Sequence, residues 1–157
     1  MDNGRVREVI LVAYDYSYKQ AEWVHPFEQC INGISADQAA WRPGPDLMGI
    51  WDIVLHVALH NEKMTARIVD GKNPELTEGD WPALPTKLTE ENWEAAKDRC
   101  RLSMRLLGET IRTAPFEKLV NSPYGLPDLL CRLTHHGYHL GQIEKIRECQ
   151  GWLEGLE

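Results

Sequence analysis

The sequence lacks the long apolar runs and the paired cysteines that would assign it to several large classes of protein. No apolar run approaches the roughly 20 residues that a membrane span requires, and Met1 to Arg5 does not follow the plan of a signal peptide. The four cysteines form no close pair and no C-x-x-C motif, which predicts reduced and mostly buried thiols. We therefore expect a cytoplasmic protein without a membrane segment.

The sequence also lacks a positive charge excess and the common catalytic motifs. A net charge of −7 argues against a nucleic-acid binder, which normally presents a basic face. There is no G-x-S-x-G motif, no P-loop and no dinucleotide fingerprint. A chain of 157 residues with 43% apolar and 26% charged residues fits one globular domain, residues 1–157.

Helical patterns account for most of the chain, and no segment has a convincing strand pattern. Apolar residues at steps of three and four, with caps and stops at their ends, predict four long helices. They span Arg5 to about Gln29 with a kink or break at Pro26, Met48 to Val69, Glu90 to about Arg112, and Pro127 to about Cys149. With a long loop over residues 72–87, this pattern predicts an all-α bundle.

Several shorter features are predicted from local chemistry. The residues from Ser35 to Gln38 have the capping-box pattern and predict a short helical turn. Thr89 is expected to cap the third long helix. Trp81 is expected to hold the 72–87 loop against the body of the protein, because a tryptophan exposed in a loop wastes a large apolar area.

The histidines of the last long helix are the main candidates for chemistry. His135 and His139 are four residues apart, so their imidazoles share one helix face, one turn apart. Two imidazoles so placed can bind one divalent metal ion, but a third ligand must come from elsewhere. His56, on the second long helix, is the strongest candidate. Periodicity leaves open whether the pair faces a cleft or solvent.

Neighbouring residues leave alternatives open. His60 can be a fourth ligand, an acid/base group beside the metal, or a surface residue. Asp52 can orient His56 or be a solvated acid near a helix start. Cys131 lies in line with His135 but is two turns, about 12 Å, from His139, so we expect Cys131 in the core.

Three stretches together resemble the DinB/YfiT-like family of metal-dependent proteins. Residues 49–58 (GIWDIVLHVA) look like the second helix of that family with its single histidine ligand. Residues 80–85 (DWPALP) precede a third helix with an early tryptophan, Trp93. Residues 135–143 (HHGYHLGQI) look like the family's H-x-x-Y-H-x-G-Q-I ending. The order and spacing match over most of the chain.

The resemblance implies an up-down four-helix bundle with a long connection between the second and third helices. It implies a divalent metal ion held by His56, His135 and His139, with zinc or nickel first and manganese or iron as alternatives. It also implies a homodimer. Better-understood relatives are thiol-dependent transferases or isomerases with a low-molecular-weight thiol as cosubstrate. The chain departs from the family at His136, where Asp is frequent, and at His60, where an aromatic residue is common.

An open three-histidine metal site would suit thiol transfer to a small electrophile, which is the leading hypothesis, or hydrolysis through a metal hydroxide. His60 and His136 are the candidate catalytic residues, as proton carriers. One alternative is a non-enzymatic metal-binding dimer or small-ligand sensor in a stress response. The other is a structural bundle with incidental histidines.

Overall fold

The computed structural model describes residues 2–21, 24–75 and 77–156, and the regular structure in these ranges is helical throughout. The predicted all-α class is therefore confirmed. In chain order the helices are α1 (Asn3–Tyr18), α2 (Phe27–Ile31), α3 (Ala36–Ala40), α4 (Ile50–Asp70), α5 (Glu90–Thr113), α6 (Phe116–Asn121) and α7 (Gly125–Gln150). No helix in the described ranges combines the length and the apolar character that crossing a membrane requires.

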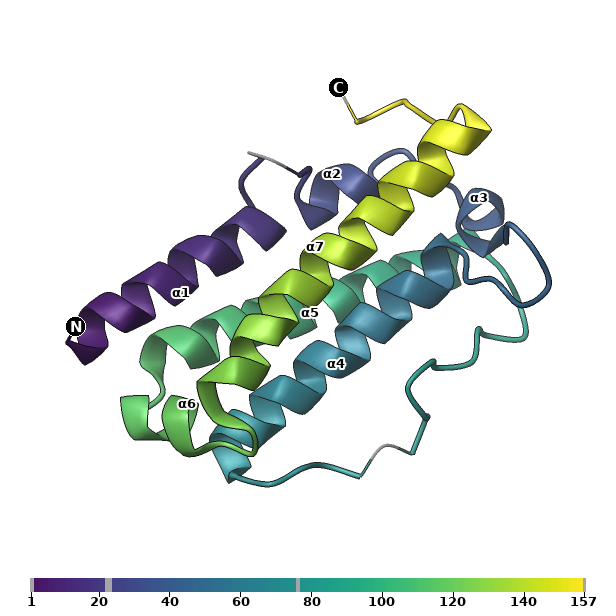
Figure 1. Ribbon diagram of the computed structural model, residues 1–157. Helices are drawn as coiled ribbons and strands as arrows, with labels where there is room; N and C mark the ends of the chain where they lie inside the picture. The colour runs from purple at the N-terminus through teal and green to yellow at the C-terminus, as the bar shows by residue number, and fades with distance from the viewer. Residues whose placement is uncertain (1, 22–23, 76, 157) are drawn as a thin grey trace.

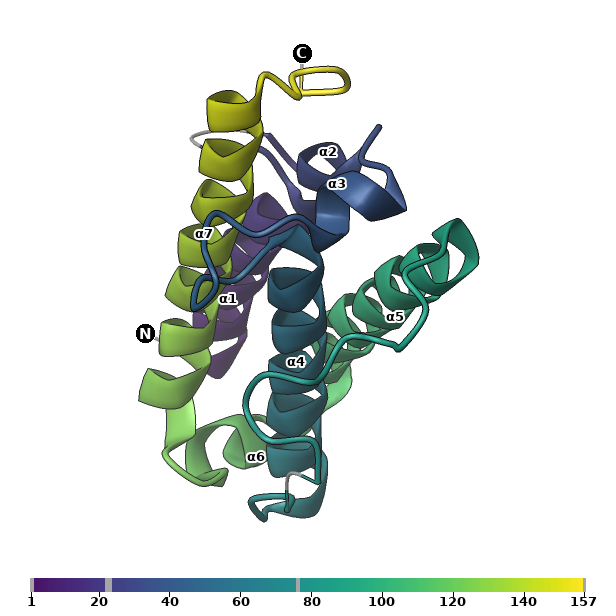
Figure 2. The same ribbon diagram turned by 90° about the vertical axis from the view of Figure 1, so that its right-hand side faces the viewer.

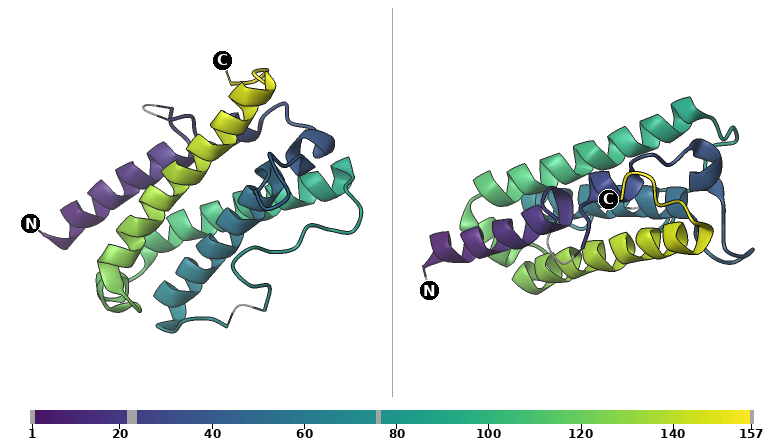
Figure 3. Two further views of the ribbon diagram at one scale, coloured as in Figure 1. Left: turned by 45° about the vertical axis from the view of Figure 1, so that its right-hand side comes forward. Right: turned by 90° about the horizontal axis from the view of Figure 1, so that it is seen from above.

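The long helices α1, α4, α5 and α7 form the body of the molecule (Figure 1). Helix α1 packs against α5 and α7, and α4 packs against the same two helices. Helices α4 and α7 run in opposite directions (Figures 1 and 3). The short helices α2 and α3 lie at one end of the body and α6 at the other.

The connection between α4 and α5 is long and passes along the outer side of α4 (Figure 2). The described parts of this connection, residues 71–75 and 77–89, contain no helix. This confirms the predicted loop. Its course brings residues 80 and 81 into contact with His56 on α4.

The apolar stripes predicted from the sequence form the core. On α4, Ile53, Val57, Met64 and Ile68 are at most 3% exposed. On α5 the predicted stripe is also buried throughout, and consists of Trp93, Ala96, Cys100, Met104, Leu107 and Ile111. The periodicity of 3.6 residues thus identified the faces that pack together.

The first helix is shorter than the sequence predicts. A helix to about Gln29 was expected, but α1 ends at Tyr18. Pro26 precedes the separate short helix α2 in an extended conformation. The backbone amide and the ring Nδ1 of His25 both lie 3.0 Å from a carboxylate oxygen of Glu144 on α7. These contacts hold the chain against α7 between the end of α1 and the start of α2. Residues 22 and 23 lie outside the described part of the chain.

The predicted caps are present. The side chain of Ser35 accepts from the amide of Gln38, and the Gln38 side chain accepts from the amide of Ser35. Thr89 accepts from the amide of Asn92 at the start of α5. Gly71 ends α4 with φ of +70°, in the left-handed region that favours glycine. The predicted connector over residues 114–124 contains one short helix, α6.

Two of the cysteines are not where the sequence analysis expected them. Cys30 and Cys100 are buried, whereas Cys131 and Cys149 are exposed. The prediction of Cys131 as a core residue is therefore wrong. Helix α7 turns Arg132 and His136 inward instead, and these positions leave Cys131 on the outer face.

Asp52 fixes the start of α4, the helix that carries His56. It is 4% exposed and receives two N–H bonds from Arg42, at 2.9 and 2.6 Å. It also accepts the backbone N–H of Gly49 at 2.9 Å. A Cβ atom on Gly49 would lie 2.3 Å from the carbonyl oxygen of Trp41, so only glycine fits there. Asp52 is thus neither solvated nor bonded to His56 in the described structure.

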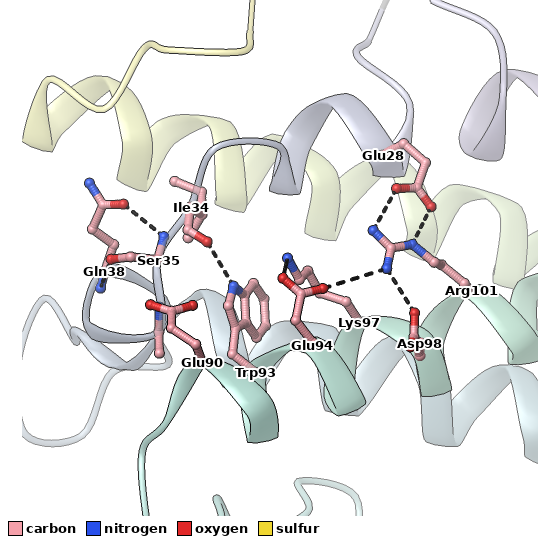
Figure 4. Close-up of polar contacts among 11 residues, drawn as sticks. Glu28, Ile34, Ser35, Gln38, Glu90, Trp93, Glu94, Lys97, Asp98 and Arg101 are labelled. Atoms are coloured by element: carbon pink, nitrogen blue, oxygen red, sulfur yellow. Dashed lines mark hydrogen bonds and ion pairs between the residues drawn. The ribbon is translucent and has the colours of Figure 1, made fainter.

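Helix α5 is tied to the segments that precede α4 (Figure 4). The indole Nε1 of Trp93 donates to the carbonyl of Ile34 at 2.8 Å. Arg101 donates two N–H bonds to the carboxylate of Glu28 on α2, at 2.8 and 3.0 Å. The Trp93 ring also packs against Trp51 of α4, with centroids 5.3 Å apart.

We expect Trp93→Ala to lower the free energy of unfolding by about 3–5 kcal/mol, because it empties a large buried volume and leaves the Ile34 carbonyl without its donor. Leu106→Ala on the same helix is the matched control: Leu106 is 46% exposed, and its loss should change stability by less than about 0.5 kcal/mol. Denaturant unfolding of both variants measures the difference. Equal effects would contradict the packing described for α5.

Candidate metal centre

Three histidines from two helices converge on one point. His56 lies on α4, and His135 and His139 lie on α7. The Nε2 atom of His135 lies 2.9 Å from Nε2 of His56 and 3.0 Å from Nε2 of His139. The ligand atoms of the three residues all lie within 4.8 Å of one another. The structure therefore brings together the three residues that the sequence analysis singled out.

The hydrogen bonds of His56 and His139 fix which ring nitrogen carries the proton. Nδ1 of His56 lies 2.6 Å from the backbone carbonyl oxygen of Asp80. Nδ1 of His139 lies 2.7 Å from the side-chain oxygen of Gln142. Because these oxygens only accept, each Nδ1 must carry the proton. Both Nε2 atoms are then left with lone pairs, as in metal-binding histidines.

His135 has the opposite arrangement. Arg132 Nη1 lies 3.0 Å from Nδ1 of His135, and a guanidinium only donates. The proton of neutral His135 must then lie on Nε2, where it faces two lone pairs. One N–H cannot satisfy both contacts, whereas a cation at the centre would satisfy all three nitrogens. Tetrahedral zinc holds nitrogen ligands about 3.3–3.4 Å apart, a few tenths of an ångström wider than the two close contacts. The three residues therefore fit a divalent ion.

Burial keeps the three imidazoles neutral. It is the main cause that lowers the pKa of His56, of His135 to about 2 and of His139 to about 4. The positive charge of Arg132 lowers the pKa of His135 further. Because only a neutral imidazole binds a metal ion, these shifts favour the binding state well below pH 7.

Trp81 covers the outer side of the cluster. Its ring stacks on His56 with centroids 4.0 Å apart and planes 16° apart. It also meets His139 edge-on at 6.0 Å. The predicted contact of Trp81 with the body of the protein is confirmed, and the surface it contacts is the histidine cluster.

His60 lies beside the cluster, one turn after His56. Its ring is 4.3 Å from that of His56 and 5.4 Å from that of His135, centroid to centroid. Neither ring nitrogen makes a hydrogen bond within the described structure, and both are shielded from solvent. The Asp80 carboxylate lies 3.7 Å from Nε2 of His60. His60 is thus an unpaired imidazole next to the three-histidine group but outside it.

His136 points away from the cluster. It is 1% exposed, and its Nε2 lies 2.6 Å from the side-chain oxygen of Asn61. Its Nδ1 lies 3.3 Å from the hydroxyl of Ser17 on α1. These contacts give His136 a place in a buried polar network between helices. No contact favours the predicted role of proton carrier, and that role stays a prediction.

A cavity of about 490 Å³ opens beside His139. The segment before α4, the loop at Trp81 and the outer face of α7 form its walls. Of the histidine pair on α7, His139 therefore faces a cleft, whereas His135 is not among the residues that line it.

Three partners of the cluster were missed by the sequence analysis: Arg132, Gln142 and the carbonyl of Asp80. Arg132 precedes His135 by three residues and Gln142 follows His139 by three. Helical spacing therefore places both on the ligand face, and this could have identified them. No sequence pattern could have identified the carbonyl of Asp80, since only the course of the long connection brings it to His56.

Comparison of the chain with protein-family models, with curated proteins and with solved structures finds no match. Membership of the DinB/YfiT-like family therefore stays a prediction that rests on the three stretches named above.

We expect Arg132→Gln to tighten zinc binding by about tenfold or more. When Nε2 of His135 binds a metal ion, the ring proton moves to Nδ1, where it meets the guanidinium of Arg132, also a donor. A glutamine oxygen at this position can accept that proton. Arg132→Met removes the charge without supplying an acceptor, so its zinc affinity should lie between that of wild type and that of Arg132→Gln. Chelator competition measures the affinities, and weaker binding by Arg132→Gln than by wild type would contradict the argument.

We also expect the metal-free chain to lose stability as the pH falls below about 6.5. Burial lowers the pKa of His136 to about 3, so the unfolded chain binds more protons than the folded chain between these values. Each such histidine adds up to about 1.4 kcal/mol of lost stability per pH unit. Urea unfolding in the presence of a chelator at pH 7, 6 and 5 measures the slope. His136→Gln should show a shallower slope, and an unchanged slope would count against His136 as a buried neutral group.

Proposed function

We propose that this chain is a metal-dependent enzyme that binds one divalent ion through His56, His135 and His139 and transfers a thiol to a small electrophile. The observation that carries the proposal is the convergence of three Nε2 atoms that share at most one proton. Zinc or nickel is the expected ion, with manganese or iron as alternatives. The resemblance noted from the sequence supports the thiol as cosubstrate.

In such a reaction the three histidines, His60 and Trp81 would have different roles. A divalent ion bound by three neutral ligands keeps open positions and its double charge, and so would supply a Lewis acid that favours the thiolate form of a bound thiol. His60 is the proposed acceptor of the thiol proton, because its ring adjoins His56 and both of its nitrogens lack a hydrogen-bond partner in the described structure. The sulfur forms a bond to an electrophilic carbon, and the leaving group departs with the electron pair of its broken bond. Trp81 limits the access of water to His56.

We also propose a helical-bundle topology, an oligomeric state and a cellular location for the protein. The contacts among α1, α4, α5 and α7 support one up-down four-helix bundle domain with a long connection between its second and third long helices. A cytoplasmic homodimer and membership of the DinB/YfiT-like family are proposed on the resemblance alone.

The first test is elemental analysis of protein purified without an affinity tag. Wild type should contain about one zinc or nickel ion per chain, and His56→Ala and His139→Ala should contain little. His25→Ala is the matched control, because His25 pairs with Glu144 away from the cluster and its loss should leave the metal content unchanged. Equal metal in all four proteins, or none in wild type, would overturn the proposed site.

The second test is turnover of thiol and electrophile pairs by metal-loaded protein. His60→Ala should keep its metal and lose about 100-fold or more in kcat. Metal binding in wild type without turnover of any pair would favour a metal-stabilised module or small-ligand sensor over an enzyme.

A further inference from the structure

The cavity beside His139 has an apolar lining drawn from three separate segments. Trp41, Leu47 and Met48 come from the segment before α4, Trp81 from the long connection, and Tyr138 and Ile146 from α7. Its volume of about 490 Å³ lies within the range of roughly 300–1,000 Å³ typical of small-molecule sites. Leu47 and Tyr138 are 55% and 63% exposed. Large apolar side chains are therefore held open to solvent next to the histidine cluster.

Several polar groups of the lining are engaged in hydrogen bonds or ion pairs, and Cys149 adds an uncharged thiol. The side-chain oxygen of Gln142 accepts a hydrogen bond from Nδ1 of His139. Its side-chain N–H donates to the hydroxyl of Tyr138 at 3.0 Å. At the rim, Lys145 is paired with Glu148, and Asp46 carries the opposite charge to Lys145. The cavity thus offers neither a net charge nor a free cluster of donors, and these features favour an uncharged, apolar occupant.

The wall formed by the segment before α4 is anchored. Arg42, near the start of this segment, donates two hydrogen bonds to the carboxylate of Asp52 on α4. The edge of Trp41 packs against Trp152, with centroids 5.8 Å apart and planes 85° apart. A cavity with anchored walls is pre-formed, so that binding does not have to order the segment first.

We infer that this cavity binds the apolar body of the electrophile, rather than the thiol, and holds its reacting carbon toward the three histidines. The inference rests on the proposed function, which supplies the thiol and the metal ion. A low-molecular-weight thiol rich in hydroxyl and carboxylate groups would find few donors, among them Lys145 and the hydroxyl of Tyr138, in this mostly apolar lining. The substrate class is accordingly an uncharged aliphatic or aromatic compound with one electrophilic carbon at its end.

A homologous series of straight-chain alcohols from 1-butanol to 1-octanol tests the cavity without any reaction. Calorimetric titration of wild type, with zinc and after treatment with a chelator, should show affinity rising roughly fourfold per methylene, as expected for burying about 0.8 kcal/mol per methylene. Leu47→Ser and Tyr138→Ser should each weaken 1-octanol binding by about threefold or more. Leu130→Ser is the matched control, since Leu130 is 50% exposed on α7 but does not line the cavity.

The outcomes separate this inference from the proposed function. Chain-length-dependent binding that survives removal of zinc and is weakened only by the two lining variants supports the cavity as an apolar subsite. Affinity that does not change with chain length, or equal effects of Leu47→Ser and Leu130→Ser, would overturn it. Failure of the alcohols to bind a protein that still binds metal and turns over thiol would refute the cavity alone. Alcohol binding by wild-type protein that contains no metal as purified and takes up neither zinc nor nickel when these ions are added would refute the proposed function alone.

Discussion

The organisation of this protein depends on three imidazole nitrogens that lie within reach of one another and share too few protons to pair. His56 and His139 each present a lone pair, because a carbonyl oxygen accepts the proton on the far side of each ring. His135 can offer one proton to two partners. In a buried place such an arrangement costs free energy unless a cation occupies it. Packing of α4 on α7 holds the three rings in place.

Arg132 opposes this arrangement within the same helix. Its guanidinium stabilises the tautomer of His135 that does not bind metal, and its charge repels a cation. Two of the three histidines thus present a lone pair to the centre, and the third would have to change tautomer to bind a metal ion. This contrast stabilises neutral His135 and would reduce the affinity of the three residues for a metal ion.

The surroundings of the cluster differ on its two sides. On one side of the cluster lie His60 of α4 and Arg132 of α7. Both are polar side chains, and the ring nitrogens of His60 and Nε of Arg132 are shielded from solvent. In the other direction the helices open to the apolar cavity lined by Leu47 and Tyr138. Trp81 belongs to both, because it stacks on His56 and lines the cavity. The long connection between α4 and α5 therefore contributes both to the cavity and to the surroundings of the three histidines.

The sequence by itself determined the long helices α4, α5 and α7, the buried stripes of α4 and α5, the caps at Ser35 and Thr89, and the pairing of His135 with His139, because each of these follows from spacing within one helix. Only the tertiary structure decided that α1 ends at Tyr18, that Cys131 is exposed, that His136 turns toward Asn61 and Ser17, and that Asp80 supplies an acceptor to His56. The physical reason is the difference between local and long-range interactions. Periodicity shows which residues share a helix face, whereas the packing of separate helices and loops decides what that face meets.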